Sequence, residues 1–392
     1  MIVCAGKLAH RPVARDEPGQ QIVSAQAATR GRDAAANLPG IDILKGLACL
    51  LIVAHHLAFY GPMSTVVYPL APALIDGLFH YGRMAVQVFL VVSGFLVARS
   101  LAPRGLATNL SPARLIFRRY FRLMLLYLVA VAASVTVAAW VRPWFAHPSV
   151  PAEATLVQLL AHGLLLQDLM GLEALSAGVW YVAIDFQLFA LTVLMFSLSC
   201  RFEKRWPALR AWPLSPGQLL TLAACAASLF LFNTDAFWDV IGLYFFGAYG
   251  LGMLAFWASQ SDRRDFWLLT LGMLAGTALL FDFRERLLVA AVVSFGLATL
   301  PRLASGNKPA GWLQRQFGSL GKISYSVFLI HFPVCLLVNA VVIRFWPADL
   351  AANAFGLLAA LALSVLAGSV LYRSVESRTA LYFSRFKPRF FS

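Results

Sequence analysis

An apolar segment, "LKGLACLLIVAHH" at residues 44–56, carries a lysine near one end and two histidines at the other. Lys45 and His56 are eleven residues apart, close to three helical turns, so a helix projects both side chains from nearly one face. Their separation along such a helix is about 16 Å. A neutral imidazole can accept a proton near neutral pH, and an ammonium group can bind an anion. The spacing therefore predicts a helix with a base near one end and a cation near the other.

Two more ionisable residues accompany this pair. Asp42 lies one turn before Lys45 on a neighbouring face, and His55 projects about 100° away from His56. Ionisable groups inside a membrane span are costly and usually face a cavity, a partner or a pathway. The alternative is that Lys45 extends to lipid headgroups and the histidines mark the opposite interface. We expect His56 to be the base and Lys45 to assist it, and whether His55 or His331 takes that role instead stays open.

A cluster of arginines opens a later apolar run, in "RRYFRLMLLY" from residue 118. Arg119 and Arg122 are three residues apart and so share one face of a helix. Because guanidinium groups bind phosphate through paired hydrogen bonds, Arg118, Arg119 and Arg122 are candidate ligands for a phosphate-bearing substrate. The alternative is that they only mark the cytoplasmic end of a span.

Other apolar runs also contain polar groups. Asp185 lies in "VWYVAIDFQLFALTV" and His331 in "ISYSVFLIHFPV"; each could face a functional cavity. The alternatives are a hydrogen bond between helices for Asp185 and a proline kink for His331. Ser93 and the following glycine permit close approach of a helix or a ligand, and Arg83 lies where it could rim an outer cavity with His80 and Tyr81. The candidate pore-lining residues are Asp42, His55, Ser93, Trp180, Gln187, Tyr325 and His331.

The composition is typical of a membrane protein. Of the 392 residues, 60% are hydrophobic and 13% are charged, against about 25% charged in soluble domains. Long apolar runs separated by short basic or Pro/Gly-containing joints predict an all-α, polytopic transmembrane helical bundle, without the alternating pattern of a β-barrel. We predict about ten spans, at 41–60, 84–102, 119–141, 178–199, 216–232, 237–258, 266–281, 287–300, 319–343 and 352–372.

The distribution of Lys and Arg orients this bundle with both termini cytoplasmic. Residues 156–170 are apolar but contain His162, Gln167 and Asp168, so we interpret them as an interfacial or re-entrant helix. The net charge of +14 follows from the topology and requires no nucleic-acid partner. The basic residues left on the outer side are Arg83, Arg142, Arg284, Arg286 and Arg344.

Three segments are expected along the chain. Residues 1–37 are predicted to be a disordered cytoplasmic leader without a signal peptide, and whether they are translated in the native protein is open. Residues 38–375 form the transmembrane domain, and 376–392 a basic cytoplasmic tail. The five cysteines show no CxxC pair and no metal-ligand spacing, so we predict neither a disulfide nor a bound metal.

Together these runs resemble the membrane acyltransferase-3 family, whose members acylate cell-surface glycans and related acceptors. "IDILKGLACLLIVAHH" is similar to the family's first helix, in which ten residues separate a basic residue from a histidine. "VFLVVSGFLVARS" and "RRYFRLMLLY" are similar to its second and third helices, and "VWYVAIDFQLF" and "GKISYSVFLIHFPV" to two later motifs. Lys45 stands where arginine is commoner, and Asp185 where glutamate is more usual. The resemblance runs from Ile41 to about Arg373.

The resemblance implies an integral-membrane O-acyltransferase of the bacterial inner membrane, with no bound cofactor. It would move an acyl group, most simply acetyl, from cytoplasmic acyl-CoA to a hydroxyl of a cell-envelope glycan or lipid-linked sugar. In that scheme the arginine cluster and Lys45 hold the CoA headgroup. His56 takes the hydroxyl proton, and Asp185 fixes the tautomer of that imidazole. A covalent acyl-histidine is the chemical alternative.

Other functions fit the same residues. A proton- or solute-coupled secondary transporter would also bury ionisable groups among ten spans, and "GLYFFGAYGLG" at 242–252 could be one of its broken helices. A non-catalytic subunit of a glycan-assembly complex would need no active His–Lys pair. Within acyltransferases, a succinyl donor or an amine acceptor would leave nearly the same sequence. The sequence does not predict the oligomeric state.

Overall fold

The computed structural model describes residues 39–103, 105, 111–299 and 311–379. Contacts along the chain separate Met1–Pro39 from Gly40–Ser392, and nearly all described residues belong to the second unit. The predicted leader at 1–37, and most of the predicted tail at 376–392, lie outside the described residues.

Each of the ten predicted spans coincides with a helix, and the described ranges contain no β-strand, which confirms the all-α class. The corresponding helices are α2 (Pro39–Phe59), α5 (Ala85–Leu101), α6 (Pro112–Val141), α8 (Val179–Arg205), α9 (Pro216–Ala227), α10 (Gly242–Gln260), α11 (Arg264–Phe281), α12 (Glu285–Thr299), α13 (Trp312–Phe345) and α14 (Leu350–Leu371). The shorter helices are α3 (Pro62–Val67), α4 (Pro72–Tyr81) and α7 (Leu156–Leu164).

Within the described ranges, seven helical segments are long and apolar enough to cross a membrane. The helices α9, α10 and α12 are not among them. Two of these, α9 and α12, are shorter than the roughly 20 residues that a span requires, and α10 is rich in glycine and in aromatic residues that carry polar groups. The total of ten spans and the cytoplasmic position of both termini therefore stay predictions. With 9 residues, α7 is too short to span.

Helices α2 and α13 cross at two glycines. A Cβ atom on Gly321 would lie 1.9 Å from the carbonyl oxygen of Asp42, and one on Gly46 would lie 2.5 Å from that of Phe317. Any larger residue at these positions would push the two helices apart. The crossing sets the two helices close enough for histidines further along each of them to meet.

A second glycine contact joins α5 to α10. A Cβ atom on Gly94 would lie 1.9 Å from the carbonyl oxygen of Tyr249, and one on Gly252 would lie 2.0 Å from that of Val91. The close approach expected after Ser93 is therefore confirmed, with α10 as the neighbour. The glycine-rich run at 242–252 lies in one continuous helix, which corrects the alternative of a broken helix, because its glycines serve packing.

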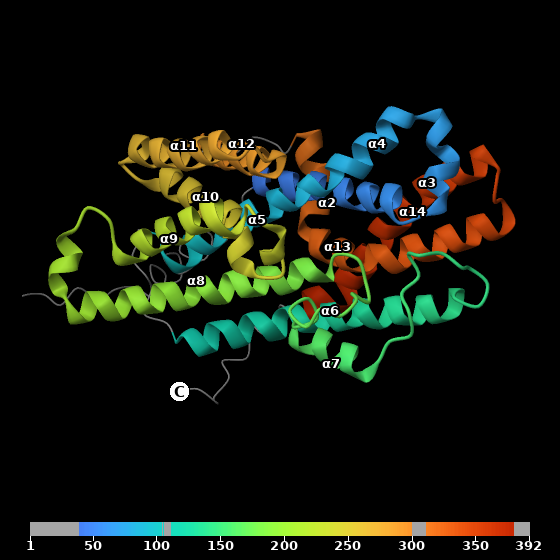
Figure 1. The fold of residues 1–392 in the computed structure, drawn as a ribbon, viewed down its shortest axis with the longest axis horizontal. Coiled ribbons are helices and arrows are strands. Elements are labelled where there is room, and N and C mark those ends of the chain that lie inside the picture. The colour runs from blue at the N-terminus through green and yellow to red at the C-terminus, as the bar shows by residue number, and fades with distance from the viewer. Residues whose placement is uncertain (1–38, 104, 106–110, 300–310, 380–392) are drawn as a thin grey trace, which may run out of the picture. The chain divides into compact units, whose positions relative to one another are not determined.

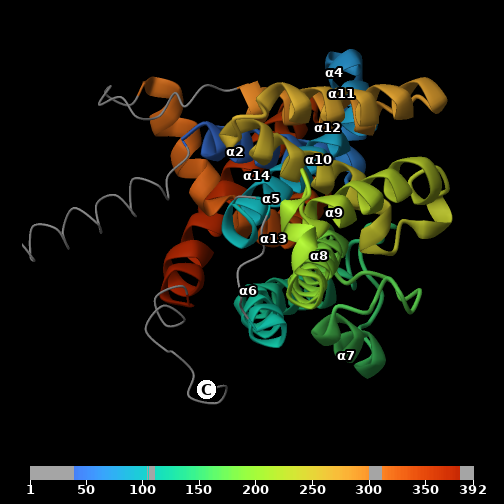
Figure 2. The ribbon, with the colours of Figure 1, turned by 90° about the vertical axis from the view of Figure 1, so that its left-hand side faces the viewer.

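The remaining helices surround these two crossings. Helix α10 packs against α5 on one side and the α11–α12 pair on another (Figures 1 and 2). Helix α13 packs against α14 and α6, and α6 in turn packs against α8. Residues from α2, α6, α8 and α13 are therefore brought together from distant parts of the sequence.

Candidate active site

His56 on α2 and His331 on α13 meet at the centre of the candidate site. The Nδ1 atom of His56 lies 2.5 Å from Nε2 of His331, and the two ring planes differ by 8°. His331 is fully buried, and its own Nδ1 lies 2.7 Å from the carbonyl oxygen of Phe328. The two rings and this carbonyl form a chain of hydrogen bonds.

The carbonyl at the end of this chain determines the tautomers of both neutral rings. A carbonyl oxygen only accepts, so Nδ1 of His331 must donate to Phe328, which leaves Nε2 of His331 as an acceptor. His56 must then donate from Nδ1 to His331. The Nε2 atom of His56 is therefore left with a lone pair, which is the state that a general base requires.

A cavity of about 420 Å³ lies beside these rings, and we call it the histidine cavity. Its lining contains four basic side chains and no acid among the residues that the structure describes. His55 is fixed there by a 2.8 Å hydrogen bond from Nδ1 to the carbonyl oxygen of Leu78. The basic and aromatic lining residues are His55, His56, His80, Arg83, Phe59, Tyr60, Phe79, Trp180 and Phe328.

A second cavity, of about 240 Å³, lies toward the Lys45 end of α2. We call it the arginine cavity. Four cations and two acids line it, so its lining carries a net positive charge. Such a lining suits a ligand with several negative charges. The charged lining residues are Lys45, Arg119, Arg122, Lys322, Asp185 and Glu376.

Asp185 does not contact His56, which corrects the role expected from the sequence. Its carboxylate forms an ion pair with the guanidinium of Arg119 in the arginine cavity. A carboxylate at this depth gains more from a neighbouring cation than from a neutral imidazole. His331 takes the place that the sequence had assigned to Asp185, as the hydrogen-bond partner of His56.

Phe328 lines both cavities, so they adjoin at this residue. Its ring contacts Tyr181 and Phe89 at centroid distances of 5.4 and 6.1 Å. A ligand that reached from the arginine cavity to His56 would pass this side chain. The site therefore consists of the arginine cavity and the histidine cavity, which meet at Phe328.

This arrangement coincides with a family match that covers most of the chain. Residues 38–373 match the model of family 3 of the acyltransferases, described as an acyltransferase domain. The chain belongs to this acyltransferase-3 family. Comparison with curated proteins and with solved structures gives no match. The family confirms the resemblance seen in the motifs, and with the apolar helices it identifies a multi-pass membrane acyltransferase.

The acyltransferase brings most of the predicted site residues to the two cavities. Ser93 and Tyr325 line the arginine cavity. Four others line neither cavity: His331, which reaches the site through His56, and Asp42, Gln187 and Arg118. Asp42 forms a 3.0 Å ion pair with Lys45, and Gln187 accepts a 2.7 Å hydrogen bond from the backbone of Gly242 at the start of α10. Arg118 is exposed on α6, and unlike Arg119 and Arg122 it does not line the arginine cavity.

Two charged residues of the acyltransferase site were missed in the sequence. Lys322 lies directly before the "ISYSVFLIH" run of α13, and Glu376 follows α14 in the segment assigned to the tail. Glu376 accepts a 2.6 Å hydrogen bond from Ser326. This bond holds the segment after α14 against α13, beside the arginine cavity. A single acid in an otherwise basic stretch was the available signal for Glu376.

Proposed function

We propose that this acyltransferase moves an acetyl group from cytoplasmic acetyl-CoA to a hydroxyl of a cell-envelope glycan, in a bacterial inner membrane with both termini cytoplasmic. The observation that carries the proposal is Nε2 of His56, which keeps its lone pair because Nδ1 bonds His331, on a ring that lines the histidine cavity next to the arginine cavity. The arginine cavity suits the phosphates of CoA. The histidine cavity suits an acceptor that brings a hydroxyl to the imidazole of His56.

The donor enters from the end of the bundle that carries Lys45. Arg119, Arg122 and Lys322 bind the anionic headgroup, and the pantetheine arm extends toward His56, about 16 Å along α2 from Lys45. Phe328 rotates to let the thioester pass into the histidine cavity.

The chemical step needs only one proton carrier. Nε2 of His56 takes the proton of the acceptor hydroxyl as its oxygen attacks the thioester carbonyl. His331 keeps Nδ1 of His56 occupied, so that the lone pair stays on Nε2. The C–S bond then breaks, the ester C–O bond is complete, and His56 returns its proton to the CoA thiolate.

The test is transfer of labelled acetyl from acetyl-CoA to envelope glycan in inverted membrane vesicles. His56→Ala should abolish incorporation at unchanged protein abundance. His147→Ala is the matched control, because that histidine bonds Ser149 in a loop and lines neither chamber. Incorporation that survives in His56→Ala would refute His56 as the base. Label that stays on the protein when acceptor is omitted would indicate an acyl-histidine instead of direct transfer.

A further inference from the structure

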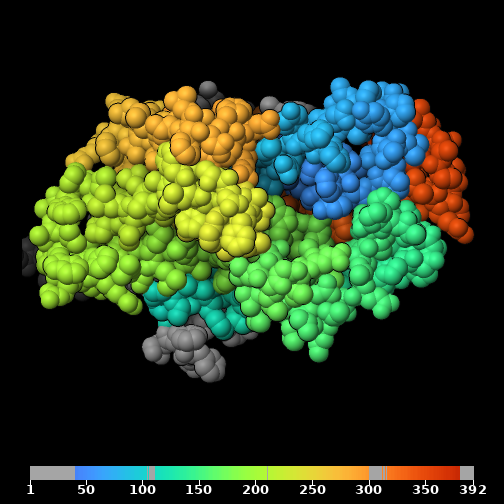
Figure 3. All heavy atoms as spheres, in the orientation of Figure 1, coloured from blue at the N-terminus to red at the C-terminus, as the bar shows by residue number. Residues whose placement is uncertain are grey.

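The histidine cavity adjoins another cavity that the proposed reaction does not use. This cavity has a volume of about 450 Å³ and shares Arg83, Val86 and Trp180 with the histidine cavity. We call it the mixed-charge cavity. In Figure 3 the surface is hollowed where α2–α4 (blue) approach the segments before α8 (green) and α10 (yellow). The volumes of the histidine cavity and the mixed-charge cavity both lie in the range of about 300–1,000 Å³ that is usual for ligand pockets.

The charges around the mixed-charge cavity balance. Its lining contains Arg83 and Arg286, and it also contains Asp168 and Asp239. Asp168 and Asp239 line the same cavity, and burial together with the nearby Asp239 raises the pKa of Asp168. A cavity with this balance of charges favours neither a cation nor an anion, in contrast to the arginine cavity and the histidine cavity.

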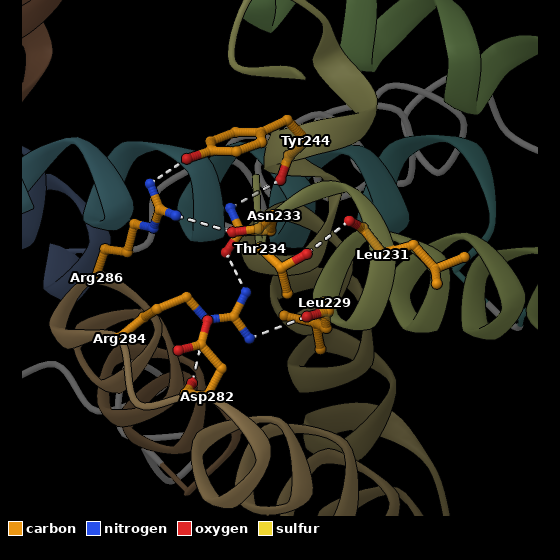
Figure 4. Close-up of polar contacts among 8 residues, drawn as sticks. All are labelled: Leu229, Leu231, Asn233, Thr234, Tyr244, Asp282, Arg284 and Arg286. Atoms are coloured by element: carbon orange, nitrogen blue, oxygen red, sulfur yellow. Dashed lines mark hydrogen bonds and ion pairs between the residues drawn. The ribbon is translucent and has the colours of Figure 1, made fainter. Parts of the chain in front are cut away.

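One wall of the cavity is fixed by a network of arginines (Figure 4). Arg286 bonds the hydroxyl of Tyr244 and, at 2.9 Å, the carbonyl oxygen of Asn233. Arg284 bonds the Asn233 side chain at 2.8 Å and the carbonyl oxygen of Leu229 at 2.9 Å. Both arginines thus satisfy carbonyls near the end of α9. They hold Tyr244 and the start of α10 in place and are not available to a ligand.

Two other polar side chains at the cavity are available. Gln87 exposes 8% of its surface, and it has no hydrogen-bond partner in the part of the chain that the structure describes. Its amide carries two N–H donors and an acceptor oxygen, which are unfavourable to bury unpaired. Arg83 is exposed at the junction of the two cavities and likewise has no acidic or hydrogen-bonded partner among the described residues.

The cavity combines these polar groups with aromatic rings. Trp180 and Phe245 line it with their ring centroids 5.7 Å apart. A sugar ring has C–H faces that can pack on aromatic rings and hydroxyls that both donate and accept, so it can satisfy an amide and a carboxylate together. A lipid chain would leave Gln87 unpaired, and an anionic group would meet Asp168 and Asp239.

We propose that the mixed-charge cavity binds an uncharged sugar unit of the acceptor, next to the unit whose hydroxyl reaches His56. The acceptor is then an oligosaccharide of at least two units, and Arg83 contacts it at the junction. This inference rests on the proposed function, since it assigns the acceptor side of the same reaction.

The test compares acceptors of different length. The probes are single sugars and oligosaccharides obtained by partial hydrolysis of the envelope glycan and sorted by size. For the wild-type protein in nanodiscs, KM for the two-unit acceptor should be about tenfold lower than for the single sugar. Gln87→Met and Asp239→Asn should reduce that ratio to near one. Glu153→Gln is the matched control, because this carboxylate is 90% exposed, lies outside the cavities, and should keep the wild-type ratio.

Binding without the donor separates this inference from the proposed function. Saturation-transfer NMR should detect the two-unit probe on the wild-type protein and lose it in Gln87→Met and Asp239→Asn. Such binding in a protein that transfers no acetyl would refute the proposed function and leave the sugar subsite standing. Absence of binding, or transfer that depends neither on acceptor length nor on these two residues, would overturn the subsite.

Discussion

The hydrogen bond between His331 and His56 can be tested by replacing one ring and keeping the other. In His331→Leu, the Nδ1–H group of His56 loses its acceptor, whereas in His331→Gln the amide oxygen can take that place. His331 is 0% exposed, so no bulk water replaces the lost acceptor. A donor left unpaired in such a place costs about 1–3 kcal/mol. That cost falls only on the tautomer whose Nε2 can act as a base.

A cost of this size lowers the share of the productive tautomer by a factor of about 5 to 150. In His331→Leu, kcat for acetyl transfer should therefore fall by about that factor. KM for acetyl-CoA should not change, because His331 does not line the arginine cavity. His331→Gln should retain activity within about fivefold of the wild type, since it keeps an acceptor.

The assay is steady-state transfer by purified protein in nanodiscs, with melting temperature and yield as controls for folding. Wild-type kcat in His331→Leu would show that His56 acts without an acceptor for its Nδ1–H group. Equal losses in His331→Leu and His331→Gln, at normal melting temperature, would show that His331 acts through something other than an acceptor for His56.

Arg122 and Arg118 form a matched pair on α6, because Arg122 lines the arginine cavity and Arg118 does not. Arg122→Gln should raise KM for acetyl-CoA about tenfold and Arg118→Gln should leave it unchanged; equal effects would contradict the donor site. Gly252→Ala places a Cβ atom 2.0 Å from a backbone oxygen of α5 and should cost about 2 kcal/mol of unfolding free energy, seen as a lower melting temperature. Gly276→Ala, with nothing within 4 Å, is its control, and similar melting temperatures would argue against the close crossing. Burial lowers the pKa of His162, and its Nε2 accepts a backbone hydrogen bond at 3.1 Å, so the fold favours the neutral ring. That stabilisation is complete above the unfolded pKa of about 6.5 and is lost as the pH falls below it. Hydrogen exchange in α7, corrected for intrinsic rates, should therefore rise from pH 7 to pH 5 in the wild type but not in His162→Gln, and exchange independent of pH would contradict this assignment.

The helices were predictable because each lies on an apolar run that has few alternatives in a chain with so little charge. The residues at which the helices begin were less predictable. Helix α6 begins at Pro112 and α13 at Trp312, whereas the spans were predicted from 119 and 319. In both cases the helix continues through basic or polar residues, and hydropathy marks the membrane-embedded part of a helix and not its ends.

The residues around the two cavities were predictable in part, and their pairing was not. His56 could be selected from its spacing to Lys45, because that spacing is local to one helix. Its partner His331 is 275 residues away in sequence, and the contact depends on how closely α2 and α13 cross at their glycines. The pairing of Asp185 with Arg119 depends on the neighbouring α6 in the same way. No periodicity in a single sequence encodes which of two polar helix faces meet.

The most direct test of donor transfer at His56 is the position of the donor, measured by cryo-electron microscopy with a nonhydrolysable analogue of acetyl-CoA. We expect the phosphates beside Arg119, Arg122 and Lys322, Phe328 rotated aside, and the acyl carbonyl carbon in the histidine cavity, close to Nε2 of His56. An analogue whose phosphates lie in the histidine cavity, or whose carbonyl stays apart from His56, would contradict donor transfer at His56.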